Sequence, residues 1–419
     1  MDCGKGDFAK EREIQVQVVD DLKKKLALAE KYLATLTCKE THANVKKSGD
    51  KISVIGVGRI GLCWALALAN AGFDVVGVDL FSDYVDALNR KTYTCREPLV
   101  TEELKKSKSA RFTTSIKEAV DHSDTLYVLV ATPNGGGRNL YNTDQVTAVL
   151  RAIDALKPRN KDVVISCTVA PTFCRDVAAE LLPQCKNCTV SYNPEFIAQG
   201  QIMQGMYSPD MILVGEGSKA AGSKIVRHHL AVARNCPRVC RMSPTSAEIC
   251  KLAVNCFVTA KISFANQIGD ICDRTDGSEK FQVLAAVGAD SRIGGKYLRP
   301  GYGFGGPCFP RDNRALYGWA EIVGIDAKCL KATDAYNDYH TKLQVQDLLN
   351  SGKTTHVISN VGFKDPCPVA IIEESQKLRI AEILARSGHD VTIKDVDFLV
   401  RKTQEAFGNL FKYEVLKRQ

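Results

Sequence analysis

The chain has 419 residues, of which 45% are hydrophobic and 25% are charged, and its formal net charge is +8. This composition is typical of a folded globular protein and argues against a mainly disordered chain. The apolar runs are too short to cross a membrane, and the first residues contain no apolar signal segment. The lysines are scattered, with no nucleic-acid-binding motif. We therefore expect a cytoplasmic protein of two or three domains that binds neither membranes nor nucleic acid.

The 16 cysteines do not by themselves indicate disulfides, because a long chain without a signal segment usually keeps its thiols reduced. Cys185 and Cys188 form a CxxC pair, and Cys236 and Cys240 follow with a looser spacing. One interpretation of these four is a structural zinc site, and the other is free thiols in loops. We adopt the second and expect no metal.

The first 50 residues differ from the rest of the chain. Between Glu11 and Leu36, apolar residues recur at helical spacing among many charges, and the polar run Thr41–Asp50 follows. We therefore expect residues 1–50 to be a helical extension and a linker.

From Lys51 onward, short β-branched runs alternate with helical patterns. The predicted strands are Ile52–Val57, Val75–Val78, Leu126–Val130, Val163–Cys167 and Cys188–Tyr192. The predicted helices are Gly61–Ala71, Ser82–Arg90, Ser115–His122, Asp144–Leu156 and Arg175–Leu182. Such alternation is typical of a parallel sheet with helices on both faces, so residues 51–240 are predicted to form a Rossmann-type domain of the α/β class.

The second half of the chain begins with helical patterns. A long helix is predicted from Ser246 to about Arg274, a glycine-rich loop at Gly294–Pro310, and further helix from Asn313 to about Leu349. Residues 241–345 are therefore predicted to be an all-helical central domain. Residues 346–419 are predicted to be a shortened α/β domain, with a strand, a helix and a strand at His356–Asn360, Lys377–Ser387 and Val391–Lys394.

The first predicted strand runs directly into a GxGxxG sequence and then a helix. Gly56 allows the tight turn, Gly58 lets a pyrophosphate approach the backbone, and Gly61 lets the helix pack on the strand. The helix start around Ile60 offers N–H groups to phosphates. Asp79 ends the second strand, 18 residues after Gly61, where a carboxylate accepts ribose hydroxyls and repels a 2′-phosphate. We predict an NAD site; a tight turn without a cofactor is the alternative.

A cysteine follows a glycine-rich segment in the second half of the chain, within Gly301–Asp312. A helix beginning near Cys308 would favour its thiolate, and Asp312 would lie one turn later on the same face. For an isolated cysteine, an inert buried thiol is the more common interpretation. The glycine-rich context and Asp312 favour a nucleophile here.

Two further polar groups have no obvious structural purpose. Glu195 comes directly after a predicted strand, within Asn193–Gly200. Lys251 and Asn255 are four residues apart on an otherwise apolar helix, where they need a buried partner or a ligand. A solvated polar stripe is the alternative for this pair.

At these residues the sequence resembles the UDP-glucose/GDP-mannose dehydrogenase family, over roughly residues 51–395. The motifs GxGxxG, NPEF, KxxxN and GFGGxCxxxD occur in the order of the family. Thr132-Pro133 resembles its TP motif and Ser291–Gly294 its arginine segment. NPEF is typical of the members that act on UDP-glucose or GDP-mannose, and Ile197–Gly200 looks more like the UDP-glucose enzymes.

The resemblance implies NAD-dependent oxidation of a nucleotide sugar at C6 to the carboxylate, through a thioester on Cys308. It implies that Lys251, Asn255 and Thr132 stabilise oxyanions, that Asp312 assists proton transfer and that Glu195 is the base for hydrolysis. Thr132 is also expected beside the cofactor. The implied substrate contacts are Glu195, Phe196, Ile197, Lys251, Arg292, Tyr302, Gly305 and Lys364, with Arg292 acting across the interface of a homodimer or higher oligomer.

Three departures from the family pattern stand out. Gln199 occupies the place of a second glutamate, and Glu373 occupies the place of an arginine near the nucleotide. The C-terminal domain is expected to end after strand Val391–Lys394 and one helix. Two alternatives therefore stay open beside a UDP-glucose enzyme. One is an enzyme for GDP-mannose or another nucleotide sugar, and the other is a poorly active NAD-binding homologue with a structural or regulatory role.

Overall fold

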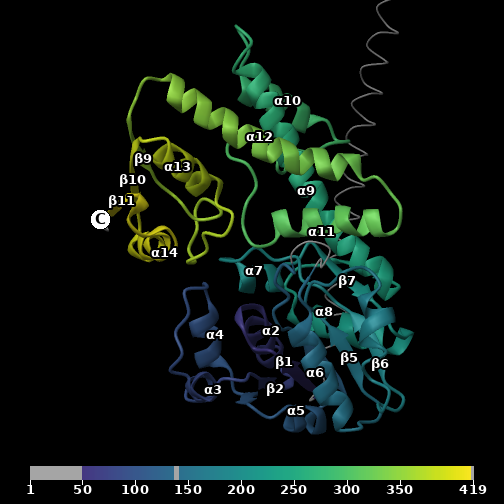
Figure 1. The fold of residues 1–419 in the computed structure, drawn as a ribbon. Helices are drawn as coiled ribbons and strands as arrows, with labels where there is room; N and C mark the ends of the chain where they lie inside the picture. Colours follow the sequence, from purple (N-terminus) through teal and green to yellow (C-terminus); the bar gives the residue numbers. More distant parts are fainter. Residues whose placement is uncertain (1–49, 136–140, 417–419) are drawn as a thin grey trace, which may run out of the picture.

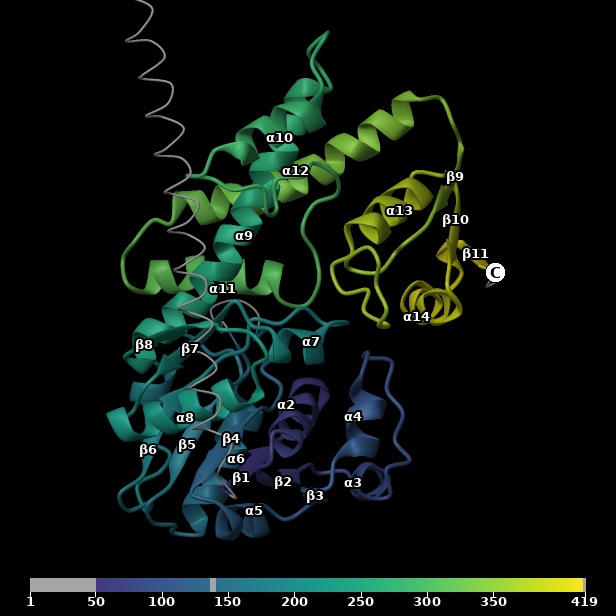
Figure 2. The ribbon, with the colours of Figure 1, turned by 180° about the vertical axis from the view of Figure 1, so that it is seen from behind.

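A computed structural model describes residues 50–135 and 141–416. The chain forms a large α/β part, a group of long helices above it and a small α/β part beside the helices (Figures 1 and 2). The helix and nearly all of the linker predicted in residues 1–50 lie outside the described residues. None of the described helices is both long and apolar enough to span a membrane.

The large part is built on an eight-stranded sheet of order β3-β2-β1-β4-β5-β6-β7-β8. All neighbouring strands are parallel except β6 and β7. The strands are β1 Lys51–Ile55, β2 Asp74–Val78, β3 Ala110–Thr113, β4 Thr125–Val128, β5 Asp162–Ile165, β6 Thr189–Tyr192, β7 Met211–Gly215 and β8 Arg238–Met242. The order of the strands reverses between β1 and β4, because the chain moves outward from β1 to β3 and then returns to the other side of β1. The carboxyl ends of β1 and β4 form the crevice where such sheets bind ligands.

Helices cover both faces of this sheet. They are α2 Arg59–Asn70, α3 Ser82–Asn89, α4 Val100–Lys106, α5 Ile116–His122, α6 Asp144–Ala155, α7 Ile202–Tyr207 and α8 Lys219–Val232. Helix α2 is buried from Gly61 to Ala69 because α4, α7 and α8 pack around it. The Rossmann-type fold is confirmed. The sequence patterns missed β3, β7, β8, α4, α7 and α8.

The helix predicted at Arg175–Leu182 is wrong in position and type. The chain instead forms a π-helical segment, η1 Phe173–Ala178, followed by turns. The backbone N–H groups of Thr172 and Cys174 donate to the buried Glu248 carboxylate, at 2.6 and 2.8 Å. This long-range cap determines where the segment starts, and no local pattern reveals it.

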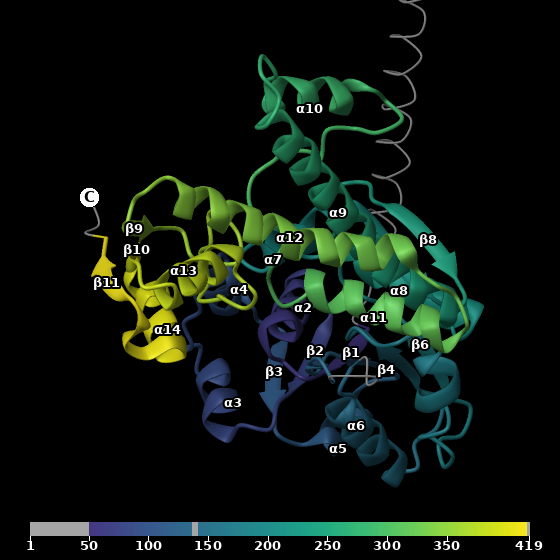
Figure 3. The same cartoon turned by 45° about the horizontal axis from the view of Figure 1, so that its top comes forward.

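Four helices form the central part: α9 Pro244–Cys272, α10 Lys280–Ala289, α11 Phe309–Ile322 and α12 Lys328–Asn350. Helix α9 begins against β7 and packs on both α11 and α12 (Figure 3). It starts two residues before the predicted Ser246, because the Ser243 side chain caps it and Pro244 occupies its first turn. Helix α10 was not predicted, and Gly324, with φ +80°, separates α11 from α12.

The small part contains β9 Thr355–Ile358, α13 Gln376–Arg386, β10 Asp390–Asp395, α14 Asp397–Phe407, the 3-10 turn η2 Gly408–Leu410 and β11 Lys412–Val415. Its parallel sheet has the order β11-β10-β9. The expectation that this part ends after strand Val391–Lys394 and one helix is wrong, since β11 follows α14. Strand β11 lies at the sheet edge and is mostly exposed, so it lacks the apolar pattern of a buried strand.

The small part faces the large part across the carboxyl ends of the first sheet (Figure 1). The Arg96 guanidinium lies 4.4 Å from the centre of the Phe398 ring in α14. Pro368 approaches Gly200 in the loop after β6 so closely that a Cβ on Gly200 would lie 2.7 Å from its ring. The loop after β6 therefore lies between the two parts.

Candidate active site

The glycine loop after β1 is shaped by close backbone contacts. Gly56 has φ +92°, and a Cβ there would lie 2.7 Å from the Leu129 carbonyl oxygen. A Cβ on Gly61 would collide with the carbonyl oxygen of Gly56. Gly58, which directly precedes α2, has open space within 4 Å of its Cβ position. A phosphate therefore has room at the N-terminus of α2, where free N–H groups and the helix dipole attract anions.

Asp79 directly follows β2, beside this loop. It is partly exposed, and among the described residues its carboxylate accepts one long hydrogen bond, of 3.4 Å, from the Phe81 N–H. The Leu80 and Phe81 side chains around it are 82% and 72% exposed. The carboxylate thus has oxygen atoms available for ribose hydroxyls, and the residues present fit NAD.

Cys308 directly precedes α11, as predicted, and the Asp312 N–H donates to its carbonyl oxygen at 2.8 Å. Burial raises the pKa of the Cys308 thiol, and the neighbouring charges of Arg311 and Lys251 oppose that shift. The expected thiolate at a helix N-terminus is therefore not the favoured resting form, because desolvation outweighs the nearby positive charges.

Asp312 is fully buried and accepts three hydrogen bonds. The donors are the Tyr141 hydroxyl at 3.0 Å, Asn255 Nδ2 at 2.7 Å and Arg311 Nε at 2.9 Å. Arg311 also donates to the Thr132 carbonyl oxygen at 3.1 Å. The structure thus brings together Asn255, Asp312 and Thr132. Sequence reasoning missed Tyr141, which has no local signal, and Arg311, which the adjacent Asp312 could have indicated.

Lys251 occupies the centre of the site, with 7% of its surface exposed. Its Nζ donates to the Glu195 backbone carbonyl at 2.6 Å and lies 4.6 Å from the centre of the Phe196 ring. Burial lowers the Lys251 pKa, while the charges of Asp312 and Cys308 raise it. Burial raises the Glu195 pKa to about 7, although the positive charge of Lys251 opposes this shift. Lys251 therefore interacts with both the predicted base and the predicted nucleophile.

Side chains from earlier in the first domain fix the loop after Glu195. The buried carboxylate of Glu97 accepts bonds from the Gly200 and Ile202 N–H groups, both at 2.7 Å. Arg59 in the GxGxxG loop donates to Gln199 Oε1 at 2.8 Å. Gln199 thus connects the proposed substrate loop to the cofactor loop. Sequence reasoning missed both Glu97 and Arg59.

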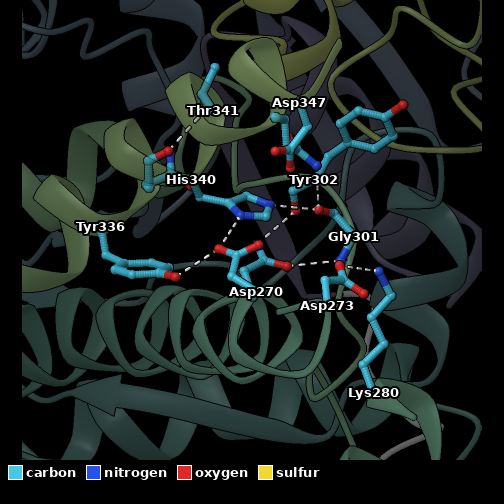
Figure 4. A network of polar contacts seen from close by, with 12 residues as sticks. Asp270, Asp273, Lys280, Gly301, Tyr302, Tyr336, His340, Thr341 and Asp347 are labelled. Carbon is cyan, nitrogen blue, oxygen red and sulfur yellow. Dashed lines mark hydrogen bonds and ion pairs between the residues drawn. The ribbon is translucent and has the colours of Figure 1, made fainter. Parts of the chain in front are cut away.

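Side chains from α9 and α12 hold the start of the glycine-rich segment (Figure 4). Asn266 Oδ1 accepts from the Gly301 N–H at 2.8 Å. The Gly301 carbonyl oxygen lies 2.7 Å from His340 Nε2 and 3.0 Å from Gln344 Nε2. Both backbone groups of Gly301 are therefore bonded.

The middle of the segment is held in a similar way. The Asn337 Oδ1 atom accepts a hydrogen bond from the Phe304 N–H at 2.8 Å, and Asn337 Nδ2 donates to the Phe304 carbonyl oxygen at 3.0 Å. A Cβ on Gly305 would collide with the carbonyl oxygen of Glu374. The stretch that carries Glu373 in place of an arginine thus packs directly on the glycine-rich segment, and the Glu373 and Glu374 side chains are both exposed.

Three of the predicted substrate residues lie in different surroundings. Tyr302 is half exposed, and Lys364 Nζ lies 3.5 Å from the position that a Cβ on Gly200 would take. Lys364 therefore reaches the loop after β6. Arg292 is not brought to the site within this chain, because its side chain is 86% exposed and pairs with Asp290 at 2.6 Å.

The remaining predicted residues support this region. Ile60 lies in the first turn of α2 and packs against the core. Ile197 packs on Gly205 in α7, where a Cβ would lie 3.2 Å from it. The Thr132 hydroxyl donates to the Thr168 carbonyl oxygen at 2.7 Å.

The four cysteines weighed as a zinc site differ in state. Cys185, Cys188 and Cys240 are free thiols, whereas Cys236 is disulfide-bonded, so the expectation of free thiols is wrong for Cys236. Within residues 50–135 and 141–416, no group of three or more His, Cys, Asp or Glu side chains is placed to hold a metal ion.

This fold and site define an NAD-dependent dehydrogenase. Residues 50–230 match the NAD-binding domain of the UDP-glucose/GDP-mannose dehydrogenase family, and residues 245–339 match the central domain of that family. The chain belongs to this family. It is therefore an oxidoreductase of the nucleotide-sugar dehydrogenase class, and its cofactor is NAD.

Individual relatives support this assignment. The GDP-mannose 6-dehydrogenase of Pseudomonas savastanoi pv. phaseolicola is 30% identical over 361 residues, or 82% of this chain and 80% of the relative. The UDP-glucose 6-dehydrogenase of Rhizobium meliloti is 31% identical over 298 residues, or 69% and 67%. The structure of a UDP-glucose dehydrogenase from the hyperthermophilic archaeon Pyrobaculum islandicum has a TM-score of 0.80 and 29% identity, with 88% of this chain and 86% of the other covered.

We predict that Asp79→Ala narrows the preference for NAD over NADP by about tenfold, which corresponds to about 1.4 kcal/mol. The substitution removes the carboxylate that repels a 2′-phosphate. The measurement is kcat/KM with each cofactor. Asp83→Ala, which removes an exposed acid in the first turn of α3, serves as the matched control and should keep the preference. An unchanged ratio in Asp79→Ala would contradict the assignment.

Proposed function

We propose that this protein oxidises the C6 alcohol of UDP-glucose twice, to UDP-glucuronate, through a thioester on Cys308. The observation that carries the proposal is the position of Cys308 at the start of α11, within the electrostatic reach of buried Lys251 and Asp312. A partly buried thiol beside an ammonium and a guanidinium is suited to stabilise negative charge on sulfur and on a neighbouring oxygen.

In the first oxidation, the alcohol would lose a proton to solvent and a hydride, and so become an aldehyde. NAD, held by the glycine loop after β1 and by Asp79, would supply the hydride acceptor when bound. The Lys251 ammonium and the Asn255 amide would stabilise the oxygen as it becomes negative. Asn255 is suited to this because its Nδ2 already donates to Asp312 and its orientation is therefore fixed. Thr132, whose backbone binds Arg311, would lie beside the same oxygen.

In the second oxidation, the Cys308 sulfur adds to the aldehyde carbon and forms a thiohemiacetal. Loss of a second hydride, for which a second molecule of NAD would be the acceptor, together with loss of the hydroxyl proton, would convert it to a thioester. Because burial raises the pKa of the thiol, sulfur must lose its proton as it attacks. Asp312 would assist this transfer through its network, while Arg311 and Lys251 stabilise the developing thiolate.

Water then hydrolyses the thioester. Glu195 would act as the base, since a carboxyl group with a pKa of about 7 can accept a proton from water near neutral pH. Gln199 cannot accept a proton in this role, and its amide oxygen is already bonded to Arg59. Glu195 would therefore be the single base for hydrolysis of the thioester.

The second candidate substrate is GDP-mannose. The Pseudomonas savastanoi relative, which is 30% identical over 80% of its own length, is named GDP-mannose 6-dehydrogenase. GDP-mannose is therefore a candidate substrate beside UDP-glucose. The residues around Ile197–Gly200 favour UDP-glucose. Steady-state NADH formation with both nucleotide sugars at equal concentration distinguishes the candidates, and a kcat/KM higher for GDP-mannose would reverse the assignment.

We also propose that two copies of the chain associate through α9. Four large apolar side chains on one side of this helix are exposed by 41–70%: Ile249, Phe257, Phe264 and Ile271. An exposed apolar stripe of this kind is typical of a protein interface. A second copy would also allow the exposed Arg292 to reach a neighbouring site.

The first prediction from this mechanism concerns Cys308. Cys308→Ala should lower the rate of uronate formation by at least about a thousandfold, because no thiol remains to add to the aldehyde. Product analysis by mass spectrometry measures this loss. Cys256→Ala removes a buried thiol from the neighbouring α9 and serves as the control. Uronate formation at an undiminished rate in Cys308→Ala would rule out the thioester.

The second prediction concerns pH. Glu195 must be ionised to act as a base, so hydrolysis should slow about tenfold for each pH unit below about 7 and level off above it. Glu195→Gln should release a burst of NADH and then stall, whereas Glu195→Asp should keep the pH dependence. Rapid-mixing absorbance measurements follow both phases. Steady turnover in Glu195→Gln without a burst would argue against this role.

The third prediction concerns association. Phe257→Glu places a charge in the α9 stripe and should convert the protein to monomers in analytical ultracentrifugation. Ile325→Glu changes a residue that is 61% exposed at the turn between α11 and α12, and it should leave association unchanged. If the unmodified protein is already a monomer at micromolar concentration, the α9 interface is wrong.

A further inference from the structure

Arg59 connects the glycine loop after β1 with the loop after β6. It is the first residue of α2, it directly follows Gly58, and it is exposed. Its Nη1 atom donates to Gln199 Oε1 at 2.8 Å. Gln199 lies just before α7, which packs on α2 (Figure 2). The guanidinium is therefore held beside the N-terminus of α2, near the edge formed by the carboxyl ends of the strands.

The Arg59 guanidinium keeps most of its hydrogen-bonding capacity in this arrangement. A guanidinium has five N–H donors, and a glutamine side chain is neutral. Within residues 50–135 and 141–416, Gln199 is the one side chain that hydrogen-bonds Arg59, and no carboxylate forms an ion pair with it. The carboxylate of Glu97 instead accepts from the Gly200 and Ile202 N–H groups, both at 2.7 Å. The charge of Arg59 is therefore available to a ligand.

The N-terminus of α2 supplies the other half of an anion site. Its first turn contains no acidic residue, and among the described residues no side chain caps it. The Tyr84 hydroxyl donates to the Val57 carbonyl oxygen at 2.8 Å and so fixes the loop before the helix. An anion beside Gly58 would meet the N–H groups of the first turn, the positive end of the helix dipole and the guanidinium.

We propose that Arg59 binds the diphosphate of NAD and that Gln199, through its neutral amide, positions the guanidinium for this contact. Arginine suits a diphosphate because its planar fork can donate two parallel hydrogen bonds to phosphate oxygens. This contact belongs to the cofactor site and does not depend on the thioester proposed for Cys308.

The loop after β6 has cations on two sides, and their origins separate their ligands. Lys364 Nζ comes from the small part and lies 3.5 Å from the position that a Cβ on Gly200 would take. Lys364 is among the proposed substrate contacts, so the nucleotide sugar has a cation of its own. Arg59 instead begins the helix whose N-terminus receives the cofactor, and its charge is therefore assigned to NAD.

The neutral amide of Gln199 matters because a carboxylate at this position would compete with the diphosphate. A glutamate there could form an ion pair with Arg59 and partly neutralise it. Gln199, which occupies the place of a glutamate in the family pattern, orients the guanidinium and leaves its charge intact. The same substitution that removes a carboxylate from the hydrolytic site thus serves the cofactor site.

The test measures binding without turnover. Displacement of NADH, followed by its fluorescence, gives the Kd of ADP and of adenosine, which share the adenine and the ribose but differ in the diphosphate. Arg59→Gln should weaken ADP binding about tenfold and leave adenosine binding unchanged. Arg90→Gln removes an exposed charge at the end of α3 and serves as the matched control, in which both Kd values should stay the same.

Variants of Gln199 test the positioning role. Gln199→Glu should weaken ADP binding about threefold, and this loss should shrink as the salt concentration rises, because it arises from an exposed ion pair. Gln199→Ala should also weaken ADP binding about threefold, because the guanidinium must then be ordered on binding. In the Arg59→Gln background, Gln199→Ala should have no further effect, since no guanidinium remains to be positioned. Gln199→Glu keeps the proposal testable if Arg59→Gln does not fold.

Three results would overturn the proposal: an unchanged Kd of ADP in Arg59→Gln, an unchanged Kd of ADP in Gln199→Glu at low salt, and a loss in Arg59→Gln that affects UDP instead of ADP. The last result would assign Arg59 to the nucleotide sugar. If ADP binding depends on Arg59 but no nucleotide sugar is oxidised, the proposed function fails while the diphosphate contact stands. The two failures are therefore distinguishable.

Discussion

The arrangement of the site depends on one fully buried carboxylate, that of Asp312. An unpaired charge in such a place would cost several kcal/mol, so its partners are held firmly. They come from distant parts of the chain: Tyr141 from the loop before α6, Asn255 from α9 and Arg311 from α11. Because all three bond the same side chain, the start of α11, and with it Cys308, is fixed relative to the first sheet.

The same burial determines the protonation of the groups around it. Desolvation lowers the pKa of Lys251 and raises those of Glu195 and Cys308, while the charges of these groups partly offset one another. The pKa values of Lys251 and Glu195 are therefore brought closer to neutral pH than they would be in water, which suits proton transfer in both directions, whereas the pKa of Cys308 moves further above it. The low-polarity surroundings that make these charges costly also strengthen their action on a substrate oxygen.

Features that depend on neighbours in sequence could be predicted, and features that depend on tertiary contacts could not. The turn at Gly56, the start of α9 to within two residues and the position of Cys308 before α11 follow from local patterns. The partners Glu97 and Tyr141 had no local signal, because each bonds residues about a hundred or more positions away. Strand β11 was missed because an exposed edge strand has no buried face to impose alternation.

The central claim is that one cysteine lets a single site carry out both oxidations. The most direct test is the amount of NADH formed per nucleotide sugar consumed, measured with limiting UDP-glucose, excess NAD and identification of the product. The account predicts two NADH per sugar, UDP-glucuronate as the product and no aldehyde released. One NADH per sugar with free aldehyde in solution would contradict it.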